Sequence, residues 1–165
     1  MQVRGKKNTA SQLASVYSRY AARVYSFSRR LIVDVSLAES ATIDVFVQFN
    51  RIQARWQDES RTLVCLRELA IESALAHLQE RSSSAELIGL PSSTLASSNR
   101  TTRLDPVKLE RLIARLPDSL RIPYVLRDVE GLSDNDVATR LRLAKADVRH
   151  RINTARLELR RLWLG

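Results

Sequence analysis

Cysteine, glycine, proline and aromatic residues are all scarce in this chain of 165 residues. Cys65 is the one cysteine, which excludes an internal disulfide framework and a cysteine-based metal site. Four glycines, four prolines and an aromatic content of 5% provide few turn signals and few strand formers. No apolar run approaches the roughly 20 residues of a membrane span, and no hydrophobic run follows the basic first residues as in a secretory signal. These absences predict a cytoplasmic, all-α protein without membrane insertion.

Catalytic motifs are also missing from the sequence. It has no phosphate-binding glycine loop, no His-Glu-x-x-His zinc motif, no nucleophile elbow and no paired carboxylates beside a histidine. His77 follows Ala76 and precedes Leu78, at a position predicted to face solvent, so we expect a solvated surface histidine. Cys65 lies among leucine and valine residues and is expected to be a buried thiol. We therefore expect no enzyme, no cofactor and no metal site.

Positive charge is what the chain has in excess. Its 27 Lys and Arg residues outnumber 18 Asp and Glu residues, giving a net charge of +9. Within residues 140–161, eight basic residues accompany only two acidic ones. This distribution predicts a polyanionic partner. Nucleic acid is favoured over a membrane surface because the chain has no separate, long Lys-rich amphipathic helix.

The first half of the chain has the pattern of a helical bundle. Residues 9–81 contain neither proline nor glycine. Their apolar residues recur at three- and four-residue steps, which predicts helices over about 11–32, 37–55 and 61–80. We expect these three helices to form one small domain over residues 9–81.

A linker and a second helical domain are expected to follow. Residues 82–103 hold ten Ser or Thr residues together with Gly89 and Pro91, a composition typical of a flexible linker. Residues 104–165 are predicted to form a four-helix domain, with Pro106 at the first position of its first helix. Pro123 is expected to shorten or bend the second helix of this domain.

The end of the chain has the pattern of a helix-turn-helix. Ser133 is placed to cap a helix, with Asp136 three residues later, where a capping box would carry Glu or Gln. A short break near Arg142 precedes a longer helix that begins near Lys145. This helix carries an apolar stripe, expected to face inward, made of Val148, Ile152, Ala155, Leu159 and Leu162. A parallel polar stripe, suited to the DNA major groove, consists of Lys145, Arg149, Asn153, Arg156 and Arg160.

The second predicted domain contains an ordered set of motifs: Leu116-Pro117, Arg121, Glu130-Gly131-Leu132-Ser133, Asp136-Val137-Ala138, Val148, Arg151 and Ala155-Arg156. These motifs resemble region 4 of bacterial sigma factors, specifically the small extracytoplasmic-function class. Three positions depart from the family pattern: Arg142 replaces a glycine, Ala144 replaces the serine cap, and Ala146-Asp147 replaces Gly-Thr. Losing the serine cap weakens the start of the helix by about 1 kcal/mol. Asp147 in the first turn partly offsets this loss through the helix dipole.

The first domain resembles sigma region 2 in degraded form. Tyr17-Ser18-Arg19-Tyr20 and Val24-Tyr25 match its first helix. The third helix keeps the hydrophobic positions of the family but has lost most of its polar signature. The resemblance implies contact with the clamp helices of RNA polymerase through Glu39, Ser40, Ile43 and Phe46.

Trp56 lies in the loop before the third helix, where family members bind a flipped base of the −10 element. An indole ring could stack on such a base and contribute about 1–3 kcal/mol. Closing the end of the bundle is the simpler interpretation of Trp56, and the nearby Asp58 and Glu59 disfavour a close DNA path.

Taken together, the resemblance implies a sigma factor of the extracytoplasmic-function type, a dissociable subunit of bacterial RNA polymerase. Its second domain would read the −35 promoter element and its first domain the −10 element. The expected partners are core RNA polymerase, promoter DNA and an anti-sigma factor. Major-groove contacts are predicted for Lys145, Arg149, His150, Asn153 and Thr154, and phosphate contacts for Arg151, Arg156, Arg160 and Arg161.

Two other functions remain open. The chain could be a sigma-like interaction protein that binds an anti-sigma factor or polymerase without melting promoters. It could also be a helix-turn-helix transcriptional regulator that dimerises through its N-terminal helices. Losses in the polar signature of the first domain favour the former.

Overall fold

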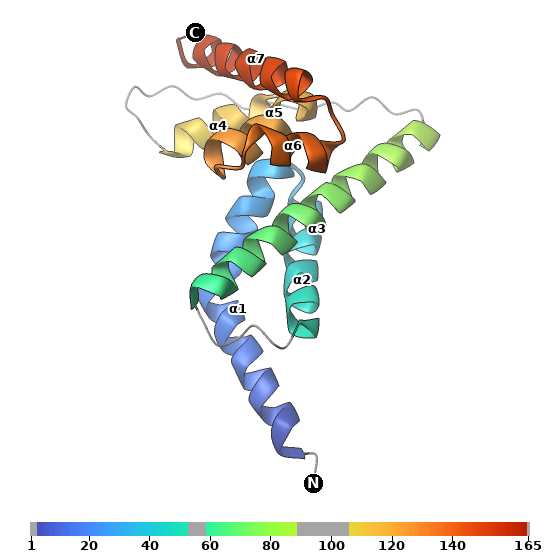
Figure 1. Ribbon diagram of the computed structural model, residues 1–165, viewed down its shortest axis with the longest axis vertical. Helices are drawn as coiled ribbons and strands as arrows, with labels where there is room; N and C mark the ends of the chain where they lie inside the picture. Colours follow the sequence, from blue (N-terminus) through green and yellow to red (C-terminus); the bar gives the residue numbers. More distant parts are fainter. Residues whose placement is uncertain (1–2, 53–58, 89–105, 165) are drawn as a thin grey trace. The chain divides into compact units, whose positions relative to one another are not determined.

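The computed structural model describes the backbone of residues 3–52, 59–88 and 106–164, and side chains within these ranges for residues 11–52, 59–82 and 107–164. The chain divides into two compact units, Met1–Ser92 and Ser93–Gly165. The described residues are helical apart from short connections and contain no strand, so the all-α prediction is confirmed. Figure 1 shows the helices of each unit. None of the described helices is long and apolar enough to cross a membrane.

The N-terminal unit is a bundle of three helices: α1 (Val3–Leu31), α2 (Val35–Arg51) and α3 (Glu59–Ile88). Helix α1 begins earlier than the sequence predicts. Helix α3 runs to Ile88, so the expectation that the linker starts at residue 82 is wrong, because serines 82–84 continue the helix. The rest of the expected linker, residues 89–103, lies outside the described residues.

A side-chain cap sets the start of α2. Asp34 is extended at φ −67° and ψ 126°, and its Oδ1 accepts a hydrogen bond of 2.9 Å from the Leu37 backbone N–H. The helix therefore begins at Val35, two residues before the predicted start, because the carboxylate satisfies an amide that the first turn leaves unpaired. At the end of α1, the guanidinium of Arg29 donates to the carbonyls of Ile32 and Val33.

The core of the N-terminal unit is apolar, and its polar groups are paired. Thr42 Oγ1 donates to the Ala38 carbonyl at 2.7 Å, and Ser73 Oγ donates to the Ala41 carbonyl at 3.0 Å. Such pairing removes the penalty of burying a hydroxyl. Cys65 is buried, as predicted. Fully buried apolar residues come from all three helices and include Leu31, Ile32, Ala41, Val45, Phe49, Ile71 and Ala74.

His77 is not the solvated surface histidine that the sequence predicts. Only 17% of its side chain is exposed, and its Nε2 lies 2.8 Å from Asp44 Oδ2. The prediction failed because residue spacing on α3 does not show that α2 packs against that face. The pair connects the two helices through their side chains.

The C-terminal unit contains α4 (Pro106–Arg115), α5 (Asp118–Tyr124), α6 (Asp134–Leu141) and α7 (Lys145–Leu164). A π-helical segment, η2 (Val125–Val129), continues α5. Pro123 lies inside α5, so the predicted disturbance appears as a change to π-helical bonding directly after it. Lys108 Nζ lies 4.2 Å from the centre of the Trp163 ring and joins α4 to the end of α7.

Candidate nucleic-acid interface

Helix α6 has a side-chain cap at its start and a left-handed residue at its end. Ser133 Oγ accepts from the Asp136 N–H at 3.1 Å, and the Asp136 carboxylate accepts from the Ser133 N–H at 3.3 Å. The predicted cap is thus a complete capping box with Asp in place of Glu. At the other end Arg142 adopts the left-handed conformation (φ 53°), and Leu143 N–H donates to the Ala138 carbonyl at 3.0 Å, as in a Schellman motif.

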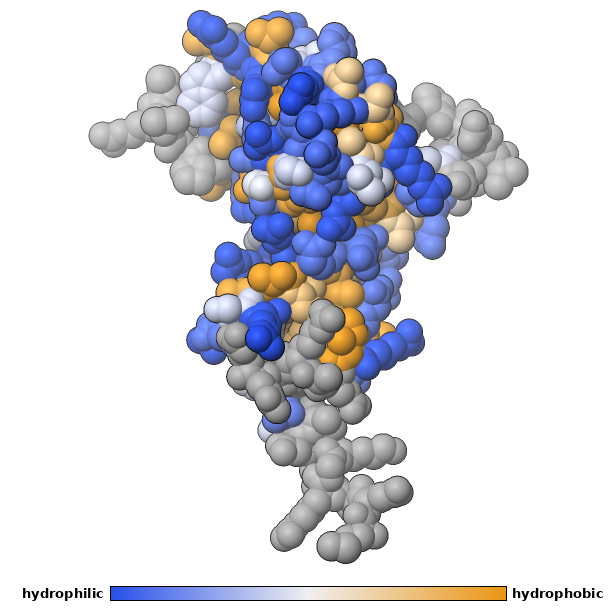
Figure 2. Space-filling view, in the orientation of Figure 1, coloured by the Kyte–Doolittle hydropathy of each residue, from blue (hydrophilic) through white to orange (hydrophobic). Residues whose placement is uncertain are grey.

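The apolar stripe of α7 faces inward, as predicted. Val148 and Ala155 are fully buried, Ile152 and Leu159 are nearly so, and Leu162 is half-buried. This burial fixes the rotation of α7 about its own axis, because turning the helix would expose the whole stripe. The surface over α6 and α7 is mainly hydrophilic on the face seen in Figure 2.

The polar stripe of α7 is consequently presented outward. Arg151 and Thr154 are half-buried, whereas the other residues predicted to contact DNA are exposed: Lys145, Arg149, His150, Asn153, Arg156, Arg160 and Arg161. The structure therefore brings these side chains together on one helix, with an accessible cationic face. This geometry matches what a major-groove helix needs.

Asp134 binds two arginines from different elements. Its Oδ1 accepts from Arg127 Nε at 2.8 Å, and its Oδ2 accepts from Arg149 Nε at 2.8 Å. Hydrogen bonds from Arg149 and Arg127 lower the pKa of the Asp134 carboxyl below its ordinary 3.8. The carboxylate is therefore ionised at neutral pH and connects η2, α6 and α7.

Arg156 makes a different contact. Its Nε and one terminal nitrogen donate to the two oxygens of Asp128, each at 2.7 Å, in a bidentate ion pair. Arg156 also donates to Asn153 Oδ1 at 3.4 Å. The hydrogen bond to Asp128 raises the pKa of the Arg156 guanidinium above its ordinary value. Further along α7, Arg161 pairs with Glu158 at 2.8 Å.

Sequence reasoning missed the carboxylates that hold this face. Asp128 and Asp134 were not among the predicted site residues, and neither was Arg127. The partners lie 28 and 15 positions apart in the chain. A helical stripe indicates which residues share a face but not which residues of another helix meet it, so no signal in the sequence identified these pairs.

The residues predicted to contact polymerase fall into two classes. Glu39, Ser40 and Ile43 are exposed on α2. Phe46 is 5% exposed and packs edge-on against Tyr17 of α1, with ring centres 4.9 Å apart, so it supports this surface from beneath. Trp56 lies outside the described residues.

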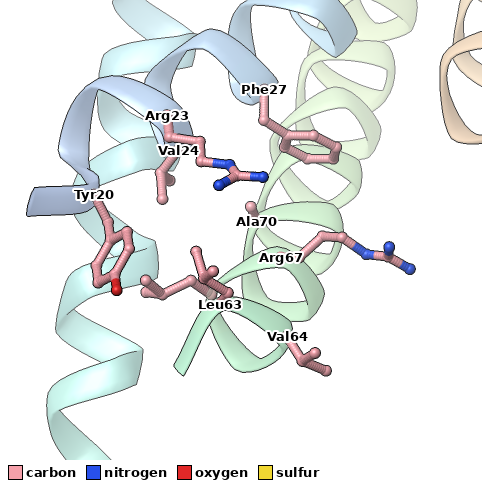
Figure 3. A pocket seen from close by; sticks show the side chains of 9 residues that line it. Tyr20, Arg23, Val24, Phe27, Leu63, Val64, Arg67 and Ala70 are labelled. Atoms are coloured by element: carbon pink, nitrogen blue, oxygen red, sulfur yellow. The ribbon is translucent and has the colours of Figure 1, made fainter. Parts of the chain in front are cut away.

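Hollows mark the surface that the described residues of the N-terminal unit form. One, of about 260 Å³, lies between α1 and α2 beside Ile43 and Val47. The other, of about 210 Å³, lies between α1 and α3 (Figure 3). Its wall is mainly apolar and includes the side chains of Val64, Arg23 and Arg67. Among the described residues, no group of three or more His, Cys, Asp or Glu side chains is arranged to hold a metal ion.

Comparison with known proteins identifies the second unit. Residues 107–159 match the family described as sigma-70, region 4. The C-terminal unit is therefore similar to sigma-70 region 4 over most of its length. The matched residues include α6 and α7, the two helices that the sequence predicts as a helix-turn-helix.

The likeness to sigma factors extends over most of the chain. It is 26% identical over 152 residues to the RNA polymerase sigma-H factor of Pseudomonas aeruginosa, covering 84% of this chain and 79% of the relative. The crystallised sigma factor RpoE of Bartonella quintana, in complex with the anti-sigma factor NepR, has the same fold with a TM-score of 0.58. That match has 17% identity and covers 94% of this chain and 96% of the other. Together these findings support a sigma factor role.

Proposed function

We propose that this protein is a sigma factor of the extracytoplasmic-function type, which directs RNA polymerase to promoters. In this proposal the C-terminal unit reads the −35 element and the N-terminal unit acts at the −10 element. The observation that carries it is the exposed cationic face of α7 in a region 4 domain. An arginine on such a face can meet phosphates or base edges in the major groove.

The N-terminal unit supports the same function through its outer surface. Ile43 is 58% exposed and Val47 is 45% exposed, one helical turn apart on α2. Neighbouring apolar side chains that are exposed to this degree are typical of a surface that meets another protein. We assign this surface, with Glu39 and Ser40, to contact with core RNA polymerase.

Reconstituted transcription tests the proposal. Core RNA polymerase is mixed with the full chain and a library of promoter-length DNA fragments, and bound fragments are selected and transcribed. We expect run-off RNA that depends on both the protein and the selected fragments. Binding of an anti-sigma factor without any run-off RNA would instead support the sigma-like interaction protein. Operator binding by a dimer without core polymerase would support the transcriptional regulator.

Two substitutions test the proposed DNA-binding face of α7 and the proposed polymerase-binding face of α2 independently. Arg149→Ala is expected to lower selection at the −35 element while leaving binding to core polymerase intact. Arg115→Ala removes an exposed arginine of α4 and is its control. Ile43→Glu is expected to weaken binding to core polymerase. Val64→Glu is its control, because Val64 is exposed to a similar degree, 62%, on α3.

Binding to DNA should also respond to salt. Each phosphate neutralised by a lysine or arginine releases counterions, so the affinity falls linearly with salt concentration on logarithmic axes. Removing one phosphate contact should reduce that slope by about 1. Arg160→Ala is the variant expected to show this, since Arg160 is exposed on α7.

A further inference from the structure

Arg149 and Arg156 lie on the same side of α7, two turns apart, but they are held differently. Arg156 uses Nε and a terminal nitrogen on Asp128. Arg149 uses Nε alone on Asp134. Neither terminal nitrogen of Arg149 makes a hydrogen bond to another residue in the part of the chain that the structure describes. Its side chain is 61% exposed.

This difference matters for reading a base. Guanine offers two acceptors, O6 and N7, in the major groove, and an arginine with two available donors can meet both. Arg149 retains both terminal nitrogens for such a contact, whereas the bidentate pair with Asp128 occupies that capacity in Arg156. An arginine that is already held in position also loses less rotamer freedom when it binds.

The net charge of Arg127, Asp134 and Arg149 allows DNA to approach them. Asp134 alone would repel phosphates, but it lies between the guanidinium groups of Arg127 and Arg149. The three side chains together carry a net charge of +1, whereas Asp128 and Arg156 together are neutral. Only 19% of the Asp134 side chain is exposed, so the arginines present the charge that faces solvent.

We infer that Asp134 is a positioning residue for base recognition: it fixes Arg149 through Nε so that the two terminal nitrogens face one guanine of the −35 element. Arg127 holds the other oxygen of Asp134 and keeps the carboxylate in place. Asp128 and Arg156 brace α7 without setting the base preference. This inference rests on the proposed function of the C-terminal unit.

Selection with randomised DNA tests the inference. The holoenzyme, formed from core polymerase and the full chain, selects fragments randomised over the −35 element. The wild type is expected to prefer guanine at one position by about 10-fold or more. Arg149→Ala should remove that preference. Asp134→Asn should reduce it at the same position by several-fold, with total binding to DNA equal to or above that of the wild type.

Matched variants exclude a merely structural or electrostatic effect. Asp128→Asn removes the same charge from the neighbouring pair and should leave the base preference unchanged. The double variant Asp134→Asn/Arg149→Ala should match Arg149→Ala alone, because Asp134 acts through Arg149. Circular dichroism of each variant checks that the fold is retained, and Asp134→Ala provides a second test at the same position.

The outcomes separate the two claims. If wild-type holoenzyme selects no −35 sequence, the proposed function fails. If the wild type selects a sequence but Asp134→Asn and Asp134→Ala keep its full base preference, the positioning role is overturned while the proposed function stands. A gain in affinity for all sequences alike, without loss of preference, would also overturn it, because Asp134 would then act only as a charge.

Discussion

The guanidinium of Arg121 is buried beneath the turn between α4 and α5, where one terminal nitrogen donates to the Leu116 carbonyl at 2.8 Å. A second contact goes to the half-exposed carboxylate of Asp118. A buried, permanently charged side chain is tolerated only when its donors are paired. Arg121 is also one of the positions on which the resemblance to region 4 rests. Its role is thus to hold the turn that orients α4 against α5.

Arg121→Ala should lower the free energy of unfolding of the C-terminal unit by about 2–4 kcal/mol, because it leaves a cavity and an unpaired buried carbonyl. Urea unfolding measures this loss by fluorescence in a Trp56→Phe background, where Trp163 is the remaining tryptophan. Asp118→Asn is the control and should have the smaller effect. Equal stability of Arg121→Ala and the parent would contradict this role.

Ser133→Ala should destabilise the C-terminal unit by about 1 kcal/mol, since it removes the oxygen that pairs with the Asp136 amide at the start of α6. The same fluorescence measurement applies. Ser133→Asp keeps an acceptor at this position and should recover most of the loss. If Ser133→Asp is as unstable as Ser133→Ala, the cap is not the cause.

Low pH should weaken the capping box at the start of α6. The hydrogen bonds from Ser133 lower the pKa of the Asp136 carboxyl below 3.8, and those from Arg149 and Arg127 lower that of Asp134. A carboxyl with a depressed folded-state pKa contributes stability above its unfolded pKa and loses it as the pH falls through the folded value. Stability should therefore decline below about pH 4. In urea titrations from pH 6 to pH 3, Asp136→Asn should show a shallower decline than the wild type.

Arg142→Gly should stabilise the C-terminal unit by up to about 1 kcal/mol. Arg142 has φ 53°, where an L side chain is strained and glycine is not. The greater backbone entropy of glycine in the unfolded chain limits the gain. Arg140→Gly makes the same exchange inside α6 and should destabilise by about 1 kcal/mol. Losses of similar size in both variants would refute the strain at Arg142.

Cys65 should react with a thiol reagent only when the N-terminal unit opens. Its side chain is buried in the bundle, so the native thiol is shielded from an aqueous disulfide such as Ellman's reagent. We expect slow labelling in buffer and complete labelling within the mixing time in concentrated urea. Labelling as fast in buffer as in urea would show that the core around Cys65 is open.

Local features of the fold could be predicted from the sequence. The capping box at Ser133, the break near Arg142 and the buried stripe of α7 each depend on residues within a few positions of one another. Hydrophobic periodicity alone specifies which side of α7 is buried, and hence that Arg149 and Arg156 face outward. The apolar pattern begins at Leu37 and so predicts the start of α2 two residues late, because the helix is in fact set by the Asp34 cap.

Contacts between distant segments could not be predicted. A sequence gives no register between α2 and α3, so it does not show that His77 meets the carboxylate of Asp44, which is 33 positions away. For the same reason, the sequence does not identify the carboxylates that pair with the arginines on α7, which are Asp134 for Arg149 and Asp128 for Arg156. Phe46 matched a family position, but its burial against Tyr17 depends on how α1 crosses α2. Residue type and spacing can thus nominate the residues of a site. Only the packing shows which of these side chains are exposed to a partner and which support the surface from beneath.

The π turn in η2 has a consequence for relatives of this chain. Such a turn contains one residue more than the α turn it replaces, and the Glu130 N–H bonds to the Val125 carbonyl five residues earlier at 2.9 Å. Deleting one residue between Val125 and Asp128 would restore α-helical bonding and turn Asp128 by about 100° about the axis of α5, while α7 stays packed on the core through its apolar stripe. Asp128 would then point away from Arg156 although neither residue had changed. A homologue shorter by one residue in this segment would therefore need a different acidic side chain to steady its last helix.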